Sequence, residues 1–444
     1  MHDRIKKGAN LLDDHVFQFD FLNDDFTKLL KPLQEIINIP KKQKKLVIYI
    51  NPPYAEGDNV RGIGRKDVHV CKIHTKYQTL MAKASSEMFA QFFTRIYQDS
   101  PNIILAEFSK LKILQAPNYS DFRSFFRASI EKFFVVPADS FDNVKGDFPI
   151  GFFIWNLNKD EAFEQTIADV YDTKGNFIGE KTISTYDNSK YISDWLEIYS
   201  KNISNNYVGH MASVGNDFQN QRMIFVDNEE KENWKKGGRH TRITTENLIP
   251  VSIYFAVRKC IEATWLIDRD QFLFPNEGWK TDSEFQNDCL AFTLFSNNIQ
   301  SKYGTNHWIP FTEQEVNARE KFESNFMSKF IKGKIKPDDK VDLFVVSEPK
   351  AHYEVPLNFS EEATAVFDAG RELWKYYHKQ PNCNVNASLY DIREHFQGRN
   401  EAGKMNNKSS DETYMQLISD LRLKLKKLAE KIEPKVYEYE FLKL

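Results

Sequence analysis

The sequence predicts an α/β protein that starts with part of a doubly wound domain and continues into a mixed α+β region with C-terminal helices. Two apolar, β-branched runs, 46–50 and 102–109, are separated by a stretch with helical spacing. After residue 160 the apolar residues alternate on both sides of the turn 172–176, as in an antiparallel hairpin. We therefore expect three regions, 1–160, 161–350 and 351–444.

The start of the chain indicates a strand followed by a helix. Val16, Phe17 and Phe19 predict a short strand that ends at Asp20, and a helix is expected over 26–37. With the strand 46–50, this gives the alternating order of a doubly wound α/β domain.

The stretch between the two apolar runs predicts a core helix. Its apolar positions recur at helical spacing. They are Tyr77, Leu80, Met81, Ala84, Met88, Phe92 and Ile96. We interpret these residues as packing, not as a site.

The loop after strand 46–50 reads Asn51-Pro52-Pro53-Tyr54. Neither proline can donate a ladder hydrogen bond, so the strand must end here. Each proline also pushes the residue before it into an extended conformation, which leaves a rigid loop. Rigid loops at the carboxyl ends of strands in α/β sheets are where ligands bind. The alternative is a stiff turn whose Tyr54 covers the core.

This tetrapeptide resembles the fourth motif of the amino-methyltransferases, which transfer a methyl group from S-adenosylmethionine to an amide or exocyclic amine nitrogen. The resemblance implies that the Asn51 side-chain oxygen and the Pro52 carbonyl each accept one hydrogen of the amine. The nitrogen lone pair then points at the methyl donor. Tyr54 would stack on a base flipped out of the duplex.

Two further segments resemble motifs of the same family. Asp20 is similar to the acid of the third motif, which implies a hydrogen bond to the adenine ring of the cofactor; the alternative is a cap on the next helix. Residues 135–158 resemble the eighth motif, which implies that Phe141 lies on the far face of the flipped base. The alternative is one more core phenylalanine.

The family's cofactor half is not found in this sequence. It requires a glycine-rich strand-to-helix turn and an acid after the following strand. The glycine segments 61–66, 235–240 and 367–373 do not have that context. The resemblance therefore covers residues 1–160 as the back half of a Rossmann-like methyltransferase domain. Either the cofactor half lies on a separate chain, or this chain is a remnant that no longer binds cofactor.

Residues 161–350 are similar to a target-recognition region. Their densest basic segment supplies Lys235, Lys236, Arg239 and Arg242 as candidates for contacts to DNA phosphates. The alternative is a solvated loop.

Residues 351–444 predict helices with two apolar stripes, the second of which is expected to stop at Pro434. The stripes are Ala363, Val366, Phe367, Gly370, Trp374 and Tyr377, then Tyr414, Leu417, Ile418, Leu421, Leu425, Leu428 and Ile432.

Composition limits the partners and the compartment. The formal net charge is −3, so a DNA-binding surface must be a local patch. The four cysteines show no Cys-x-x-Cys spacing, which argues against a zinc site and a disulfide scaffold and is typical of a reducing cytoplasm. No apolar run has the length of a membrane span. We expect a soluble cytoplasmic protein without a resident metal.

A weaker pattern is that of magnesium nucleases. Pro337, Asp338, Glu348 and Lys350 match it, but Pro349 interrupts the second strand that it requires.

The resemblance implies an adenine-N6 DNA methyltransferase of a restriction-modification system, incomplete at its cofactor end and acting on double-stranded DNA. One alternative is a non-catalytic DNA-recognition subunit. The other is an amino-methyltransferase that acts on glutamine or RNA, which the long region after residue 160 disfavours because a small peptide substrate does not require it.

Overall fold

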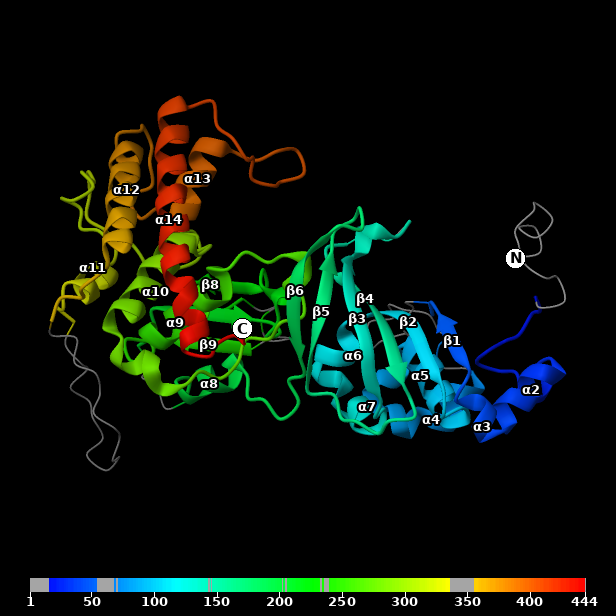
Figure 1. Ribbon diagram of the computed structural model, residues 1–444. Coiled ribbons are helices and arrows are strands. Elements are labelled where there is room, and N and C mark those ends of the chain that lie inside the picture. The colour runs from blue at the N-terminus through cyan, green and yellow to red at the C-terminus, as the bar shows by residue number, and fades with distance from the viewer. Residues whose placement is uncertain are drawn as a thin grey trace. The chain divides into compact units, whose positions relative to one another are not determined.

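The computed structural model describes residues 16–53, 68, 71–142, 144, 146–201, 203, 206–231, 234, 239–335 and 355–443. The chain forms two compact units (Figure 1). Unit 1 comprises Met1–Asn188 and Thr264–Arg269, and unit 2 comprises Ser189–Ala263 and Asp270–Leu444.

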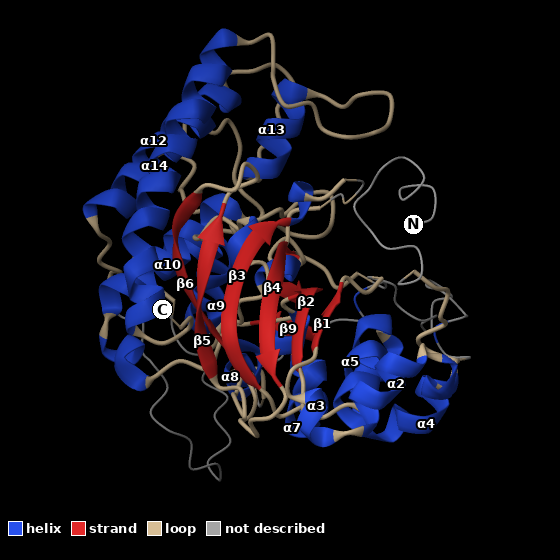
Figure 2. Cartoon of the chain, turned by 45° about the vertical axis from the view of Figure 1, so that its right-hand side comes forward, coloured by secondary structure: helices blue, strands red, loops and turns tan. Residues whose placement is uncertain are grey.

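Unit 1 is built on a six-stranded mixed sheet with the order β1-β2-β4-β3-β5-β6 (Figure 2). β1 and β2 are parallel, β4 is antiparallel to both of its neighbours, and β3 is parallel to β5. The strands are β1 (Val47–Ile50), β2 (Ile104–Lys110), β3 (Ser129–Pro137), β4 (Pro149–Asn156), β5 (Gln165–Tyr171) and β6 (Phe177–Ser184). The α/β class is confirmed, with antiparallel pairs that a fully parallel doubly wound sheet lacks.

The predicted hairpin is present as β5 and β6. Asp172 Oδ1 accepts hydrogen bonds from the backbone N–H groups of Lys174 and Asn176, at 2.8 and 2.9 Å. Gly175 has φ +80°, a conformation that favours glycine. The hairpin pairs with β3, so the first sheet continues well past residue 160 and the compact unit extends to Asn188.

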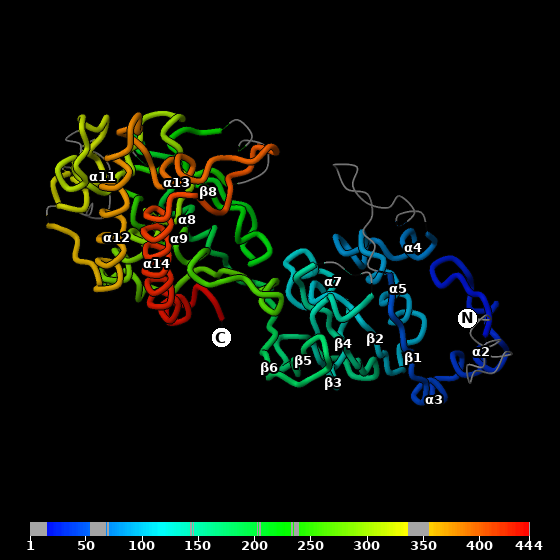
Figure 3. Tube along the Cα trace, turned by 90° about the horizontal axis from the view of Figure 1, so that it is seen from above, coloured from blue at the N-terminus to red at the C-terminus, as the bar shows by residue number. Residues whose placement is uncertain are grey.

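One face of this sheet is covered by the helices α4 (Lys72–Met81), α5 (Met88–Asp99) and α7 (Ser120–Phe125), which lie on the same side (Figure 3). Most of the predicted helical stripe is buried here, although Leu80 is exposed. The helix is interrupted at Ala82, which has φ +47°. The other helical segments of unit 1 are α2 (Lys31–Asn38), α3 (Pro40–Gln43), α6 (Lys112–Gln115), η2 (Phe26–Lys28), η4 (Ala82–Ser86), η5 (Pro117–Tyr119), η6 (Ala138–Ser140) and η9 (Trp265–Ile267).

The opposite face of the sheet carries exposed apolar side chains. Val47 and Tyr49 on β1 are 59% and 63% exposed, and Ile167 and Phe177 on the hairpin are 60% and 56% exposed. Aromatic rings of different strands lie close together on this face: the ring centroids of Tyr49 on β1 and Phe152 on β4 are 6.4 Å apart. Large contiguous apolar faces on soluble proteins are rare and mark interaction sites.

The predicted strand at residues 16–20 is wrong, because the backbone there pairs with no strand. Phe19, together with Phe21 and Phe26 that follow this segment, packs on a cation instead. The Arg95 guanidinium lies 5.7 Å from the ring centroid of Phe19, 5.1 Å from that of Phe21 and 4.2 Å from that of Phe26. These side-chain contacts, not alternation, fix the local conformation.

The helix expected over 26–37 is shorter. It begins at Lys31 as α2, after the short 3-10 turn η2. Proline has no backbone N–H and fits only the first turn of a helix, so Pro32 sets this start.

Unit 2 combines a small antiparallel sheet with helices. The sheet has the order β8-β7-β9, with strands β7 (Gly209–Ser213), β8 (Ile224–Asp227) and β9 (Arg239–Ile243). α12 and α14 lie side by side (Figure 1). The helices are α8 (Ile192–Ile198), α9 (Leu248–Lys259), α10 (Ser283–Ser296), α11 (Phe326–Ile331), α12 (Glu361–His378), α13 (Leu389–Gln397) and α14 (Glu412–Glu438), with the 3-10 turns η7 (Phe218–Asn220) and η10 (Glu277–Thr281).

The first predicted C-terminal stripe is confirmed as the buried side of α12. Gly370 allows close packing there, because a Cβ atom at this position would collide with the Phe295 ring of α10. Of the second stripe, Tyr414, Ile418, Leu421, Leu428 and Ile432 are buried in α14.

The predicted end of α14 at Pro434 is wrong, because the helix continues to Glu438. Val436 is fully buried, and Lys435 Nζ lies 3.2 Å from Asp282 Oδ2. This packing outweighs the cost of about 3 kcal/mol that a helix-interior proline carries. Among the described helices, none combines the length and apolar content needed to span a bilayer.

Candidate functional site

The Asn51 loop follows β1 directly, as predicted. Strand β1 ends at Ile50, which pairs with Glu107 of the parallel strand β2. Asn51 is exposed and Pro52 is buried, so the loop rests on the protein through its first proline. The two strands present their carboxyl ends here, the place where α/β sheets bind ligands. Tyr54 lies outside the described residues.

Phe141 lies at the same end of the sheet. Its ring packs edge-on against Phe108, with centroids 5.2 Å apart, and Phe108 directly follows the partner of Ile50 on β2. Phe108 in turn packs against Phe152 at 4.8 Å. Phe141 is half-buried, so part of its surface remains accessible. The sheet therefore brings Phe141 and the Asn51 loop to the same end, the carboxyl end of β1 and β2.

Asp20 is exposed and caps a turn. Its Oδ1 accepts hydrogen bonds from the backbone N–H groups of Leu22 and Asn23, both at 3.1 Å. Its Oδ2 accepts one from Asn23 Nδ2 at 2.9 Å. The Asn23 side chain also accepts from the N–H of Lys72, which places this turn at the start of α4. None of these contacts joins Asp20 to Asn51, and the cofactor role of Asp20 stays a prediction.

A buried acid lies beside the last residue of β1. Glu107 is fully buried, and its Oε1 accepts hydrogen bonds from Trp155 Nε1 at 3.0 Å and Ser109 Oγ at 3.3 Å. Burial raises the pKa of Glu107 to about 8, although both hydrogen bonds oppose the rise. The carboxyl is therefore mostly neutral at neutral pH.

The basic candidates of unit 2 are described only in part. Arg239 and Arg242 are exposed on β9, whereas Lys235 and Lys236 lie outside the described residues. Arg242 pairs with His210 of β7, and Arg239 pairs with Ser213. Because the two arginines are an odd number of residues apart on β9, their side chains project from opposite faces of the strand. Pro337, Asp338, Glu348 and Lys350 also lie outside the described residues.

The described part of unit 1 holds no glycine-rich turn from a parallel strand into a helix. Its glycines are Gly146, Gly151, Gly175 and Gly179, in or beside the antiparallel strands β4, β5 and β6.

Sequence reasoning missed two groups of residues. Glu107 could have been noticed as a lone acid in an apolar strand. The other group, His210, Glu230 and His240, carries no metal-binding spacing, because strand pairing and a loop bring its members together.

No protein-family model and no curated protein sequence matches the chain. Among solved structures, the chain is similar to the Type IIL restriction-modification enzyme MmeI in complex with DNA, at 12% identity and a TM-score of 0.26. The match covers 90% of this chain and 56% of that one. At this TM-score the similarity does not establish a shared fold. The α/β class rests on the sheet of unit 1 itself.

Proposed function

We propose that this chain supplies the acceptor half of an adenine-N6 DNA methyltransferase of a restriction-modification system. The single observation that supports this is the position of Asn51-Pro52-Pro53 at the carboxyl end of β1, beside β2 and at the same end of the sheet as Phe141. In this proposal unit 2 recognises double-stranded DNA.

The reaction requires an amine whose lone pair faces the methyl donor. The exocyclic nitrogen of adenine is a poor nucleophile, because its lone pair is delocalised into the ring. The Asn51 side-chain oxygen and the Pro52 carbonyl accept the two amine hydrogens and turn the lone pair out of the ring plane. Tyr54 and Phe141 hold the extruded base between two rings. S-adenosylmethionine, when bound, supplies the electrophilic methyl group.

The cofactor half would have to come from a polypeptide segment outside these 444 residues. Two features of unit 1 suit such a segment. Among the described strands β1 pairs with β2 alone, so no described strand occupies its other edge, where a further strand could add. The adjoining sheet face exposes Val47 and Tyr49. A segment that adds strands to β1 and helices to this face would complete a doubly wound domain, which has helices on both faces.

The test is methyl transfer by the assembled enzyme. The chain would be combined with the polypeptide encoded directly upstream of Met1 in the frame that contains a glycine-rich strand-to-helix turn. Transfer of labelled methyl from S-adenosylmethionine to duplex DNA would then be measured. Asn51→Ala should lower turnover by about a hundredfold or more, comparable to the loss of one oxyanion-type contact.

Asn118→Ala is the matched control, because Asn118 is an exposed asparagine in η5 of the same unit. It should retain wild-type turnover. Wild-type turnover in Asn51→Ala would contradict the proposed mechanism. Labelling of RNA or protein glutamine in place of DNA would retain the amino-methyltransferase chemistry and reject the DNA substrate.

A further inference from the structure

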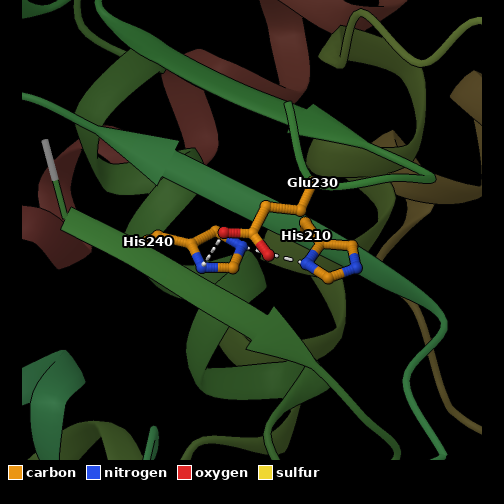
Figure 4. Close-up of side chains that lie close together, drawn as sticks. All are labelled: His210, Glu230 and His240. Carbon is orange, nitrogen blue, oxygen red and sulfur yellow. Dashed lines mark hydrogen bonds and ion pairs between the residues drawn. The ribbon is translucent and has the colours of Figure 1, made fainter. Parts of the chain in front are cut away.

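Three ligand-type side chains converge on one face of the small sheet in unit 2. His210 lies on β7, His240 lies on β9, and Glu230 lies in the connection that follows β8 (Figure 4). His210 Nδ1 lies 2.9 Å from His240 Nε2, and His240 Nδ1 lies 3.5 Å from Glu230 Oε1. Each residue offers one ligand atom, and these atoms all lie within 4.8 Å of one another.

Strand geometry explains this convergence. In the β7–β9 ladder, His210 is paired with Arg242 and His240 is paired with Ala212. The two histidines are diagonal neighbours, so both project to the same face and their rings stack with centroids 5.1 Å apart. Figure 4 shows the Glu230 carboxylate lying beside both rings. The backbone of the sheet therefore positions two of the three groups.

The spacing matches a small tetrahedral ion. With Zn–N bonds of about 2.0–2.1 Å, the donor atoms of a tetrahedral zinc site are about 3.3 Å apart. The two imidazole nitrogens His210 Nδ1 and His240 Nε2 are 2.9 Å apart, close to that value. The 3.5 Å contact of Glu230 is with the other nitrogen of His240, so the Glu230 carboxylate has to turn to reach the same ion. The Glu230 side chain is 26% exposed, so it can rotate to bring an oxygen to the ion.

The surroundings favour a bound ion over a solvated one. His210 is only 4% exposed, and Tyr207 packs edge-on against its ring at 4.8 Å. The nearby Lys231 forms an ion pair with the buried Asp227, which compensates its charge. A partly buried site that contains two imidazoles suits a transition metal better than Mg²⁺ or Ca²⁺, which prefer oxygen ligands.

We propose that His210, Glu230 and His240 bind one Zn²⁺ ion, with the fourth position open to water or another ligand. Three protein ligands with an open position are typical of zinc sites that bind a further group. Since Glu230 belongs to the connection between β8 and β9, the ion would fasten that connection to the sheet. The same connection contains Lys235 and Lys236. This inference does not depend on the methyltransferase proposal.

The test is zinc binding by the full chain without an affinity tag of histidines. Metal-free protein would be titrated with ZnCl2 by calorimetry, and with Co²⁺ by its visible absorption. We expect one ion per chain and the absorption of tetrahedral Co²⁺. His210→Ala, His240→Ala and Glu230→Gln should each weaken zinc binding by at least about tenfold, the lower end of the effect of losing even an outer-shell partner.

His395→Ala is the matched control, because His395 is exposed on α13 and should leave zinc binding unchanged. If His210→Ala unfolds, as judged by circular dichroism, the partly exposed Glu230 still provides the test through Glu230→Gln. Equal zinc uptake by wild type and His210→Ala/His240→Ala would overturn the proposal. So would the absence of zinc uptake by wild type, which would leave a hydrogen bond between the two imidazoles.

Discussion

Glu107, the ladder partner of the last residue of β1, makes the stability of the fold depend on pH. Its carboxyl is neutral at neutral pH because burial raises its pKa to about 8 from the ordinary value of 4.5. Between these two pH values the unfolded chain releases this proton while the folded chain keeps it. Stability attributable to Glu107 is therefore fully present below about pH 4.5 and is lost as the pH rises toward 8.

Glu107→Gln should remove this pH dependence. Glutamine stays neutral and keeps a carbonyl oxygen to accept from Trp155 Nε1. Wild-type stability should fall between about pH 6 and about pH 8 by up to about 1.4 kcal/mol per pH unit, the linkage limit for one proton, and the variant should lack this contribution. The measurement is the urea midpoint of unfolding at several pH values.

Glu131→Gln serves as the control, because Glu131 lies on β3 of the same sheet. Hydrogen bonds from Lys159 and Asn156 lower the pKa of the exposed Glu131, so its proton is already lost in both states above pH 6. This variant should retain the wild-type slope. An identical slope in the wild type and in Glu107→Gln would show that the Glu107 carboxyl is ionised or hydrated in the folded protein.

At the scale of elements, the sequence predicted those with strong periodicity or turn chemistry. The end of β1 before Asn51 and the hairpin around Gly175 follow from proline and glycine geometry, which acts over a few residues. The strand predicted over residues 16–20 was wrong because Phe19 packs against Arg95, a contact across a long sequence separation. The predicted helix end at Pro434 was wrong because tertiary packing of the last helical turn outweighs the tendency of proline to end a helix.

The two candidate sites differ in the same way, in whether adjacent residues or distant contacts form them. A contiguous motif such as Asn51–Pro53 can be recognised from sequence, because its chemistry lies in adjacent residues. The cluster of His210, Glu230 and His240 could not be, since it depends on the register of β7 against β9. The position of Phe141 near the Asn51 loop could not be recognised either, because it depends on packing against Phe108 of β2.

The exposed apolar face of β1 gives a prediction about assembly. Tyr49 is 63% exposed on this strand and lies on the sheet face opposite α4, α5 and α7. Tyr49→Lys would place a charge where apolar surface must be buried, so it should abolish co-elution with the upstream-encoded cofactor half in size-exclusion chromatography. The isolated wild-type chain should bind S-adenosylmethionine weakly or not at all by calorimetry.

Leu423→Lys is the control for this experiment. Leu423 is a 53% exposed apolar residue on α14 of unit 2, and its replacement should leave co-elution intact. Co-elution of Tyr49→Lys with the cofactor half would place the docking surface elsewhere. Micromolar binding of S-adenosylmethionine by the isolated chain would show that it holds a complete cofactor site.

For the whole molecule, charge restricts how DNA can be bound. A net charge of −3 gives no general attraction to phosphates, so affinity must come from a local basic surface. The two described arginines of the basic segment face opposite ways on β9. Arg239 lies 3.7 Å from Asp194, an acid that competes with phosphate, whereas Arg242 shares the face of His210 and His240. We therefore expect Arg242, and not Arg239, to contact the duplex.

Salt dependence tests this choice. Each phosphate contact releases counterions, so its removal flattens the slope of log affinity against log salt by about 0.9. Arg242→Gln should flatten the slope by that amount, whereas Arg239→Gln and the control Arg422→Gln on α14 should leave it unchanged. Asn51→Ala should also leave it unchanged, because Asn51 would contact one extruded base and no backbone. The measurement is duplex binding at several salt concentrations.

Neutralising Lys235, Lys236, Arg239 and Arg242 together without any change in slope would move the DNA surface elsewhere. Wild-type protein that binds no duplex at low salt would contradict every DNA-binding interpretation of this chain.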